Sequence, residues 1–139
     1  MPDKVASRFA ADGTAIGQSS KTQFLLLTVG LNIGVTIFTA VLAALLPKLP
    51  NTLINVPHKD YWLHPDRRAE TLADMRLTML IIAGLTSVFL AAVFHLVCRA
   101  NIQGRPLLSS AMGTFLALFL GAIAVLVIRT LIKYRRPAT

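Results

Sequence analysis

Residues 65–98 of this 139-residue chain read PDRRAETLADMRLTMLIIAGLTSVFLAAVFHLVC. The segment is polar and charged as far as Arg76, and then uncharged at neutral pH from Leu77 to Cys98. Pro65 and Asp66 both suit the first turn of a helix, because proline has a helix-compatible φ angle and aspartate complements the positive end of the helix dipole. The pattern predicts one long helix from about residue 65 to Arg99, whose first turns project from a membrane-spanning part.

Two further uncharged stretches, Phe24–Leu46 and Ala111–Ile128, are also long enough to cross a hydrocarbon core of about 30 Å. Arg129 can extend the second of them to residue 132 by directing its charge toward the membrane surface. Lipid offers no hydrogen bonds to bare backbone, so each stretch is expected to be helical. The sequence predicts an all-α integral membrane protein with a single domain over residues 1–139. Its expected parts are a polar outward tail (1–22), transmembrane helices at 24–46, 77–98 and 111–132, and a cytoplasmic loop with a helix extension (47–76).

The composition supports this class. Hydrophobic residues make up 55% of the chain and charged residues 14%, with a mean hydropathy of +0.65, whereas soluble domains carry about 25% charge. A soluble enzyme and a disordered chain are therefore not expected. The net charge of +8 comes from basic residues near the ends of the apolar stretches, which indicates contact with membrane lipids and not with nucleic acid.

The orientation follows from the basic residues that flank the apolar stretches, five on one side and nine on the other. The first side holds Lys4, Arg8, Lys21, Arg99 and Arg105, and the second holds Lys48, Lys59, Arg67, Arg68, Arg76, Arg129, Lys133, Arg135 and Arg136. The side with more cations is expected to be cytoplasmic. The N-terminus is thus predicted outside and the C-terminus in the cytoplasm.

Small residues recur at four-residue spacing in the apolar stretches, which places them on one helix face and permits close backbone approach. The helix-packing residues predicted on this basis, together with a mid-span asparagine amide that needs a hydrogen-bonding partner, are Gly30, Asn32, Gly34, Ser87, Gly113, Ala117 and Gly121. Their partners are either other helices of the same chain, as in a three-helix bundle, or other chains.

No catalytic constellation is recognisable, and the three apolar stretches contain no Asp or Glu, so neither an enzyme nor a proton-coupled transporter is expected. His58, Asp60, His64 and Asp66 cluster in the loop, but their spacing matches no closed zinc motif. His95 and Cys98 share a helix face without further ligands nearby in sequence. No metal and no cofactor are therefore predicted.

The loop before Pro65 contains Tyr61 and Trp62, and Arg67 and Arg68 follow at the start of the helix. Tyr, Trp and Arg are frequent anchors of binding surfaces. The two arginines oppose the positive end of the helix dipole, so an additional interaction should favour them. Tyr61, Trp62, Arg67 and Arg68 are predicted to contact a protein partner or anionic lipid headgroups. An ordinary belt of interfacial aromatic residues is the alternative.

The segments LINVPHKDYW (53–62) and PDRRAET (65–71), with PDKVASRF (2–9) in the tail, resemble a family of small bacterial multi-pass membrane proteins. That family carries the domain of unknown function numbered sixteen forty-eight, which also occurs in toxin-immunity membrane proteins. The resemblance implies a location in the bacterial inner membrane. The family usually has a further span before the outward loop, so we expect either that such a span precedes Met1 or that this is a shortened member that uses a partner helix instead. Arg8 stands where the family has a histidine in its outward loop, and His58 stands where the family commonly has an asparagine. The resemblance therefore gives the outward loop of this chain no role in binding a ligand.

The function expected from these features is non-catalytic: a membrane scaffold or accessory subunit that packs against other membrane proteins or against itself. Two alternatives stay open. The resemblance implies an immunity or envelope-stress protein, while Asn32 and the Gly- and Thr-containing face around it would suit a small transporter or channel.

Overall fold

The computed structural model describes residues 2–103 and 111–135, so Arg105 and Arg136 of the charge count lie outside the described residues. Helices account for 77% of the described residues. The elements are, in chain order, β1 (Lys4–Phe9), β2 (Ala15–Ser20), α1 (Lys21–Leu45), the 3₁₀ turns η1 (Leu46–Lys48) and η2 (Asn51–Leu53), α2 (Lys59–Trp62), α3 (Pro65–Ile102) and α4 (Ala111–Arg135).

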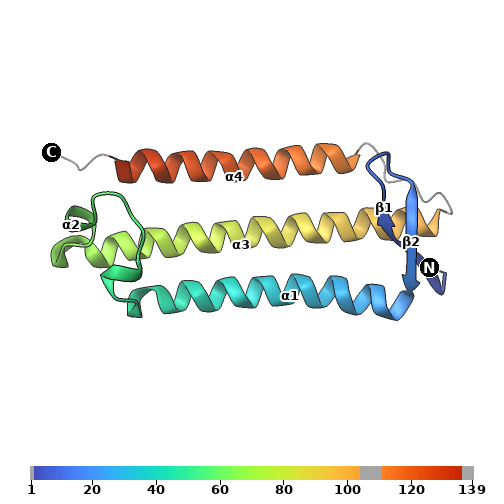
Figure 1. Cartoon of the computed structure of the whole chain (residues 1–139), viewed down its shortest axis with the longest axis horizontal. Helices are drawn as coiled ribbons and strands as arrows, with labels where there is room; N and C mark the ends of the chain where they lie inside the picture. Colours follow the sequence, from blue (N-terminus) through green and yellow to red (C-terminus); the bar gives the residue numbers. More distant parts are fainter. Residues whose placement is uncertain (1, 104–110, 136–139) are drawn as a thin grey trace.

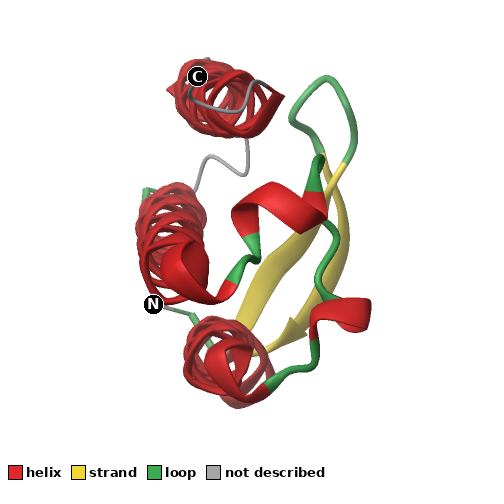
Figure 2. Ribbon diagram, turned by 90° about the vertical axis from the view of Figure 1, so that its left-hand side faces the viewer, coloured by secondary structure: helices red, strands yellow, loops and turns green. Residues whose placement is uncertain are grey.

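The three long helices form an open layer, with α3 in the middle and α1 and α4 on either side of it (Figures 1 and 2). Each is long and apolar enough to cross a membrane. The predicted segments 24–46, 77–98 and 111–132 fall within α1 and η1, α3 and α4, respectively, which confirms them as helices. Most of their apolar surface is uncovered, and in α4 only Tyr134 is buried.

Helix α3 is the single long helix that the sequence predicts. Pro65 opens it, Gln103 caps its end, and no break occurs where the charged part meets the apolar part. In its first turns the buried Leu72 packs with Met75 and Met79, as expected for side chains three to seven residues apart on one face.

Within the expected polar tail, residues 4–9 and 15–20 form a β-hairpin, which the sequence analysis did not predict. The strands are antiparallel, and Lys4 pairs with Ser20. The dipeptide Asp12-Gly13 is typical of turns, so the sequence predicts a turn here, and the structure confirms it. Gly13 has a φ of 85°, which glycine adopts without steric cost. The Asp12 carboxylate accepts hydrogen bonds from the hydroxyl and backbone N–H of Thr14, and these lower its pKa.

Strand β2 continues directly into α1. The Ser20 hydroxyl accepts a hydrogen bond from the Gln23 backbone N–H at 3.2 Å, and the Gln23 side chain accepts one from the Ser20 N–H at 3.4 Å. This reciprocal arrangement is a capping box, which satisfies two backbone donors at the helix start. The hairpin is thereby fixed in position relative to the first long helix.

Candidate functional site

Asn32 and Ser87 join α1 to α3 halfway along the layer. The Ser87 hydroxyl donates to the Asn32 side-chain oxygen at 2.7 Å, and the Asn32 amide nitrogen donates to the Ser87 carbonyl at 3.1 Å. Both residues are half-buried. The predicted interhelical hydrogen bond of Asn32 and the packing role of Ser87 are thus confirmed, and the partner is within the chain.

Gly30 and Gly34 lie on the opposite face of α1 from this contact. Each is two residues from Asn32, which at 3.6 residues per turn places it about 160° around the helix. A Cβ atom added to either glycine would have no atom within 4 Å. The interpretation that these glycines pack inside a three-helix bundle is therefore wrong.

The small residues of α4 also face outward. Phe119 faces α3 instead, and its ring stacks on Phe89 with 4.5 Å between the ring centres. Gly113, Ala117 and Gly121 are exposed, and a Cβ at either glycine would again have no atom within 4 Å. We call Gly30 and Gly34 on α1, with Gly113, Ala117 and Gly121 on α4, the outer ridges.

A polar cluster connects α4 to the other end of α3, the end that carries the loop. The Lys133 ammonium lies 2.7 Å from one carboxylate oxygen of Asp74, and the Tyr134 hydroxyl donates to the other at 2.7 Å. The Trp62 indole N–H donates to the Tyr134 carbonyl at 3.2 Å, and the two rings meet edge-on. Tyr134 is buried in the apolar cluster under the loop with Leu72. The sequence interpretation did not pair Asp74 with Lys133 or Tyr134, because Asp74 and Tyr134 are 60 positions apart in the chain.

Of the four residues predicted to contact a partner or lipid, two are engaged within the chain. Trp62 anchors α4 as described above. Arg68 donates from Nη2 to the carbonyls of Pro47 and Leu49, and from Nε to the side-chain oxygen of Asn51. The loop, through two backbone carbonyls and the Asn51 side chain, therefore supplies an interaction that favours Arg68. The predicted contact of Trp62 and Arg68 with a partner or lipid stays a prediction.

The other two residues, Tyr61 and Arg67, form a pair at the surface. The Arg67 guanidinium lies 4.3 Å from the centre of the Tyr61 ring, a distance typical of a cation–π contact. Arg67 is exposed. The predicted contact of Tyr61 and Arg67 with a partner stays a prediction.

Asn101 attaches the hairpin to the end of α3. Its side-chain oxygen accepts from the Ala6 N–H at 2.7 Å, and its amide nitrogen donates to the Ala6 carbonyl at 3.1 Å. Beneath this contact the buried Val5, Phe24 and Val97 pack together. The side chain of Asn101 thus pairs with one residue of β1 as a neighbouring strand would.

His64 and Cys98, two of the side chains weighed as metal ligands, lie in different surroundings. His64 lies 3.2 Å from the carboxylate of its neighbour Asp66. Cys98 packs at the edge of the Val5 cluster. Over residues 2–103 and 111–135, no three His, Cys, Asp or Glu side chains are grouped as a metal ion would require.

Comparisons of the chain with protein-family models, curated proteins and solved structures gave no match. The function proposed below is therefore inferred from the geometry of the chain itself.

Proposed function

We propose that this chain is a non-catalytic integral membrane protein whose outer ridges receive transmembrane helices of other subunits, so that it acts as a scaffold or accessory subunit. The observation that carries the proposal is the outward position of the small residues. Among residues 2–103 and 111–135, no neighbouring side chain or helix lies within 4 Å of a Cβ placed at Gly30 or Gly34 on α1, and the ridge on α4 is exposed as well.

The membrane location is supported by the uncovered apolar surface. Leu26, Leu27 and Ile37 on α1, and Leu118 and Ile132 on α4, each keep more than half of their surface exposed. Exposed apolar surface of this extent is rare in soluble monomers, and a lipid environment accommodates it. The cation distribution supports an N-terminus outside and a C-terminus in the cytoplasm, and the family resemblance supports the bacterial inner membrane.

The outer ridges suit helix association because lipid itself is apolar and gives helices no hydrophobic reason to associate. Contact between transmembrane helices depends on close van der Waals packing, which small residues at four-residue spacing permit. A channel within one chain is less well supported, because the described helices form an open layer that does not surround a central path (Figure 2).

The test is to purify the protein from native membranes in mild detergent and to identify the proteins that accompany it at fixed stoichiometry. Gly34→Leu and Ala117→Leu should each release such partners, or dissociate a homo-oligomer. Both side chains have open space within the chain, so helix content and thermal stability of the single chain should not change. Ala40→Leu, an exposed position on another face of α1, is the matched control.

A protein that purifies as a monomer without partners, or variants that keep every partner of the wild type, would contradict the scaffold role. Loss of partners in Ala40→Leu as well would show that bulk alone, and not the ridge, is responsible.

A further inference from the structure

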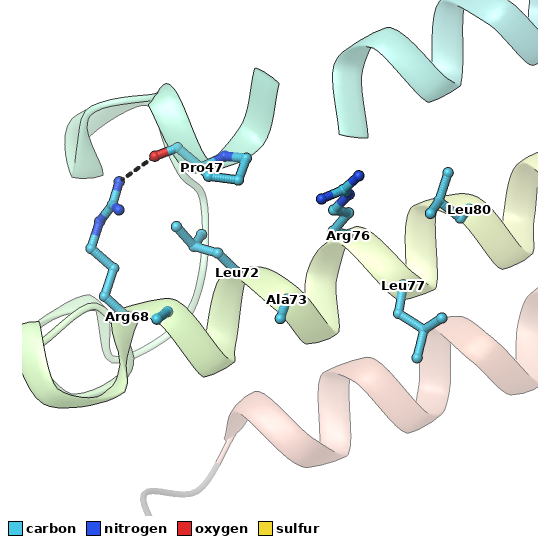
Figure 3. Close-up of a pocket in the computed structure, with 8 residues that line it drawn as sticks. Pro47, Arg68, Leu72, Ala73, Arg76, Leu77 and Leu80 are labelled. Atoms are coloured by element: carbon cyan, nitrogen blue, oxygen red, sulfur yellow. Dashed lines mark hydrogen bonds between the residues drawn. The ribbon is translucent and has the colours of Figure 1, made fainter. Parts of the chain in front are cut away.

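A groove opens beside the first turns of α3, where the charged part of the helix meets its apolar part. Its volume is about 380 Å³, and its surface is mostly apolar. Pro47, in the 3₁₀ turn η1 that follows α1, forms one wall, and side chains of α3 form the floor (Figure 3). The floor residues are Arg68, Ala69, Leu72, Ala73, Arg76, Leu77 and Leu80.

Arg76 is the available cation of this groove. Its side chain extends from α3 toward the end of α1 (Figure 3), it is exposed, and it has no hydrogen bond or ion pair with a described residue. Arg68 differs, because its Nε and Nη2 already donate to the loop. No carboxylate is among the lining residues. The groove therefore presents an uncompensated positive charge beside an apolar surface.

The position of Arg76 along α3 defines what could occupy the groove. Arg76 directly precedes the uncharged stretch that begins at Leu77, so in the proposed membrane location it lies at the level of the lipid headgroups. Leu80 is one turn further toward the apolar middle of the helix and lies on the same face as Arg76. A ligand that matches both features carries an anionic phosphate at one end and a hydrocarbon chain at the other.

We propose that this groove binds one anionic phospholipid, with its phosphodiester on the Arg76 guanidinium and an acyl chain along Leu77 and Leu80. The planar guanidinium can hold two phosphate oxygens at once, which a lysine ammonium cannot do. The proposal rests on the membrane location, and it is independent of the outer ridges.

The experiment compares lipid retention after the protein has been reconstituted in nanodiscs of phosphatidylcholine with one-fifth phosphatidylglycerol and then extracted in mild detergent. Mass spectrometry of the intact complex counts the retained lipids. Wild type should retain phosphatidylglycerol in preference to phosphatidylcholine. Arg76→Gln should lower the retained phosphatidylglycerol about fivefold, the effect expected for one basic residue near a membrane surface, and Arg76→Lys should lower it less.

Two further variants separate the groove from general electrostatics. Arg129→Gln removes a cation of α4 that does not line the groove, and it should leave retention unchanged. Ala73→Phe keeps every charge but fills part of the groove, and it should lower retention as Arg76→Gln does. Ala73→Phe also tests the proposal independently of any folding defect in Arg76→Gln, since circular dichroism reports helix content for each.

Several outcomes would overturn the lipid site: equal retention of both lipids by wild type, equal losses in Arg76→Gln and Arg129→Gln, or full retention by Ala73→Phe. Displacement of the retained lipid by inorganic phosphate at millimolar concentration would show that the groove recognises phosphate alone. Recovery of the chain in the soluble fraction would overturn the membrane location itself, whereas a membrane-embedded chain without retained lipid contradicts only the groove.

Discussion

At the scale of single residues, one polar side chain can join two helices that are far apart in the sequence. Asp74 illustrates this: one carboxylate oxygen faces the Lys133 ammonium and the other accepts from the Tyr134 hydroxyl. An ion pair that is partly exposed contributes little to stability when it stands alone. The hydroxyl contact is more valuable, because Tyr134 is buried and donates to a charged acceptor.

Tyr134→Phe should therefore lower the free energy of unfolding in detergent by about 1.5 kcal/mol, the lower end for hydrogen bonds to charged groups. Thermal or denaturant unfolding followed by circular dichroism measures the loss. Asp74→Ala and the double variant complete a cycle that isolates the contact. Strictly additive effects of the two single substitutions would show that the hydroxyl and the carboxylate do not interact.

Arg68→Lys should lower the free energy of unfolding by about 1–2 kcal/mol, because one ammonium cannot reproduce the three bonds that Nε and Nη2 make to the loop. Unfolding in detergent, followed as for Tyr134→Phe, gives the value. Arg67→Lys is the control, since the exposed Arg67 only lies over the Tyr61 ring and lysine also forms cation–π contacts. Equal stability of wild type and Arg68→Lys would contradict a structural role for Arg68.

Asn32 was predictable at this scale and Arg68 was not. An amide within an uncharged stretch needs a partner that lipid cannot supply, so its partner had to lie on another helix. Arg68 is bound by backbone carbonyls, and every residue has such a carbonyl. Only the folded course of the loop past Pro47 and Leu49 reveals which of them it meets.

At the scale of elements, helix α3 followed from its uninterrupted sequence, whereas the hairpin did not. Residues 4–9 and 15–20 lack a regular alternation of apolar and polar side chains. The register shifts between Ala6 and Phe9 also interrupt the alternation of burial along β1. The hairpin is stabilised instead by the long-range hydrogen bonds between Ala6 and the Asn101 side chain. Only the turn at Asp12 and Gly13 was readable in advance.

Asn101→Ala should loosen the hairpin without disturbing the helices. Loss of two hydrogen bonds to Ala6 should speed amide hydrogen exchange at that residue about tenfold, in keeping with roughly 1–2 kcal/mol of local stabilisation. Asn55→Ala, in the loop at the far end of the layer, serves as the control. Unchanged exchange at Ala6 in Asn101→Ala would mean that packing around Val5 alone holds the hairpin.

The geometry of a helix also determines which way the glycines of α1 face. Gly30 and Gly34 are each separated from Asn32 by two residues, so a helix cannot present all three to the same neighbour. The sequence alone thus contained the information that the asparagine and the glycines serve different contacts. It could not indicate which set faces α3, because that depends on the position of Ser87 in the folded chain.

At the scale of the whole molecule, the hairpin lies at one end of the helical layer, while the loop and the C-terminal end of α4 lie at the other (Figure 1). The two groups of basic residues used in the orientation argument are separated in the same way, apart from Arg105 and Arg136 outside the described residues. The fold thus agrees with the predicted grouping of segments. Which end of the layer faces the cytoplasm is inferred from the cation count.

A cysteine placed at Asn51 should be shielded from membrane-impermeant thiol reagents in intact cells, whereas a cysteine at Gln103 should be labelled. Both belong in a Cys98→Ser background, and labelling after cell lysis is the control for accessibility. Labelling of Asn51→Cys together with protection of Gln103→Cys would reverse the orientation and leave the fold unchanged.

The bond between Asn32 and Ser87 also has a consequence in time, because the two residues are 55 positions apart in the chain. At synthesis rates of about 5–20 residues per second, Asn32 of the proposed membrane protein emerges from the ribosome roughly 3–11 seconds before Ser87 does. During this interval the Asn32 amide is in or near the bilayer without its eventual partner. An unpaired amide in hydrocarbon is unfavourable, so α1 alone is less stable in lipid than α1 paired with α3. The hydrogen bonds form once α3 enters the membrane. An insertion machinery that holds α1 until then would prevent Asn32 from binding to a wrong partner.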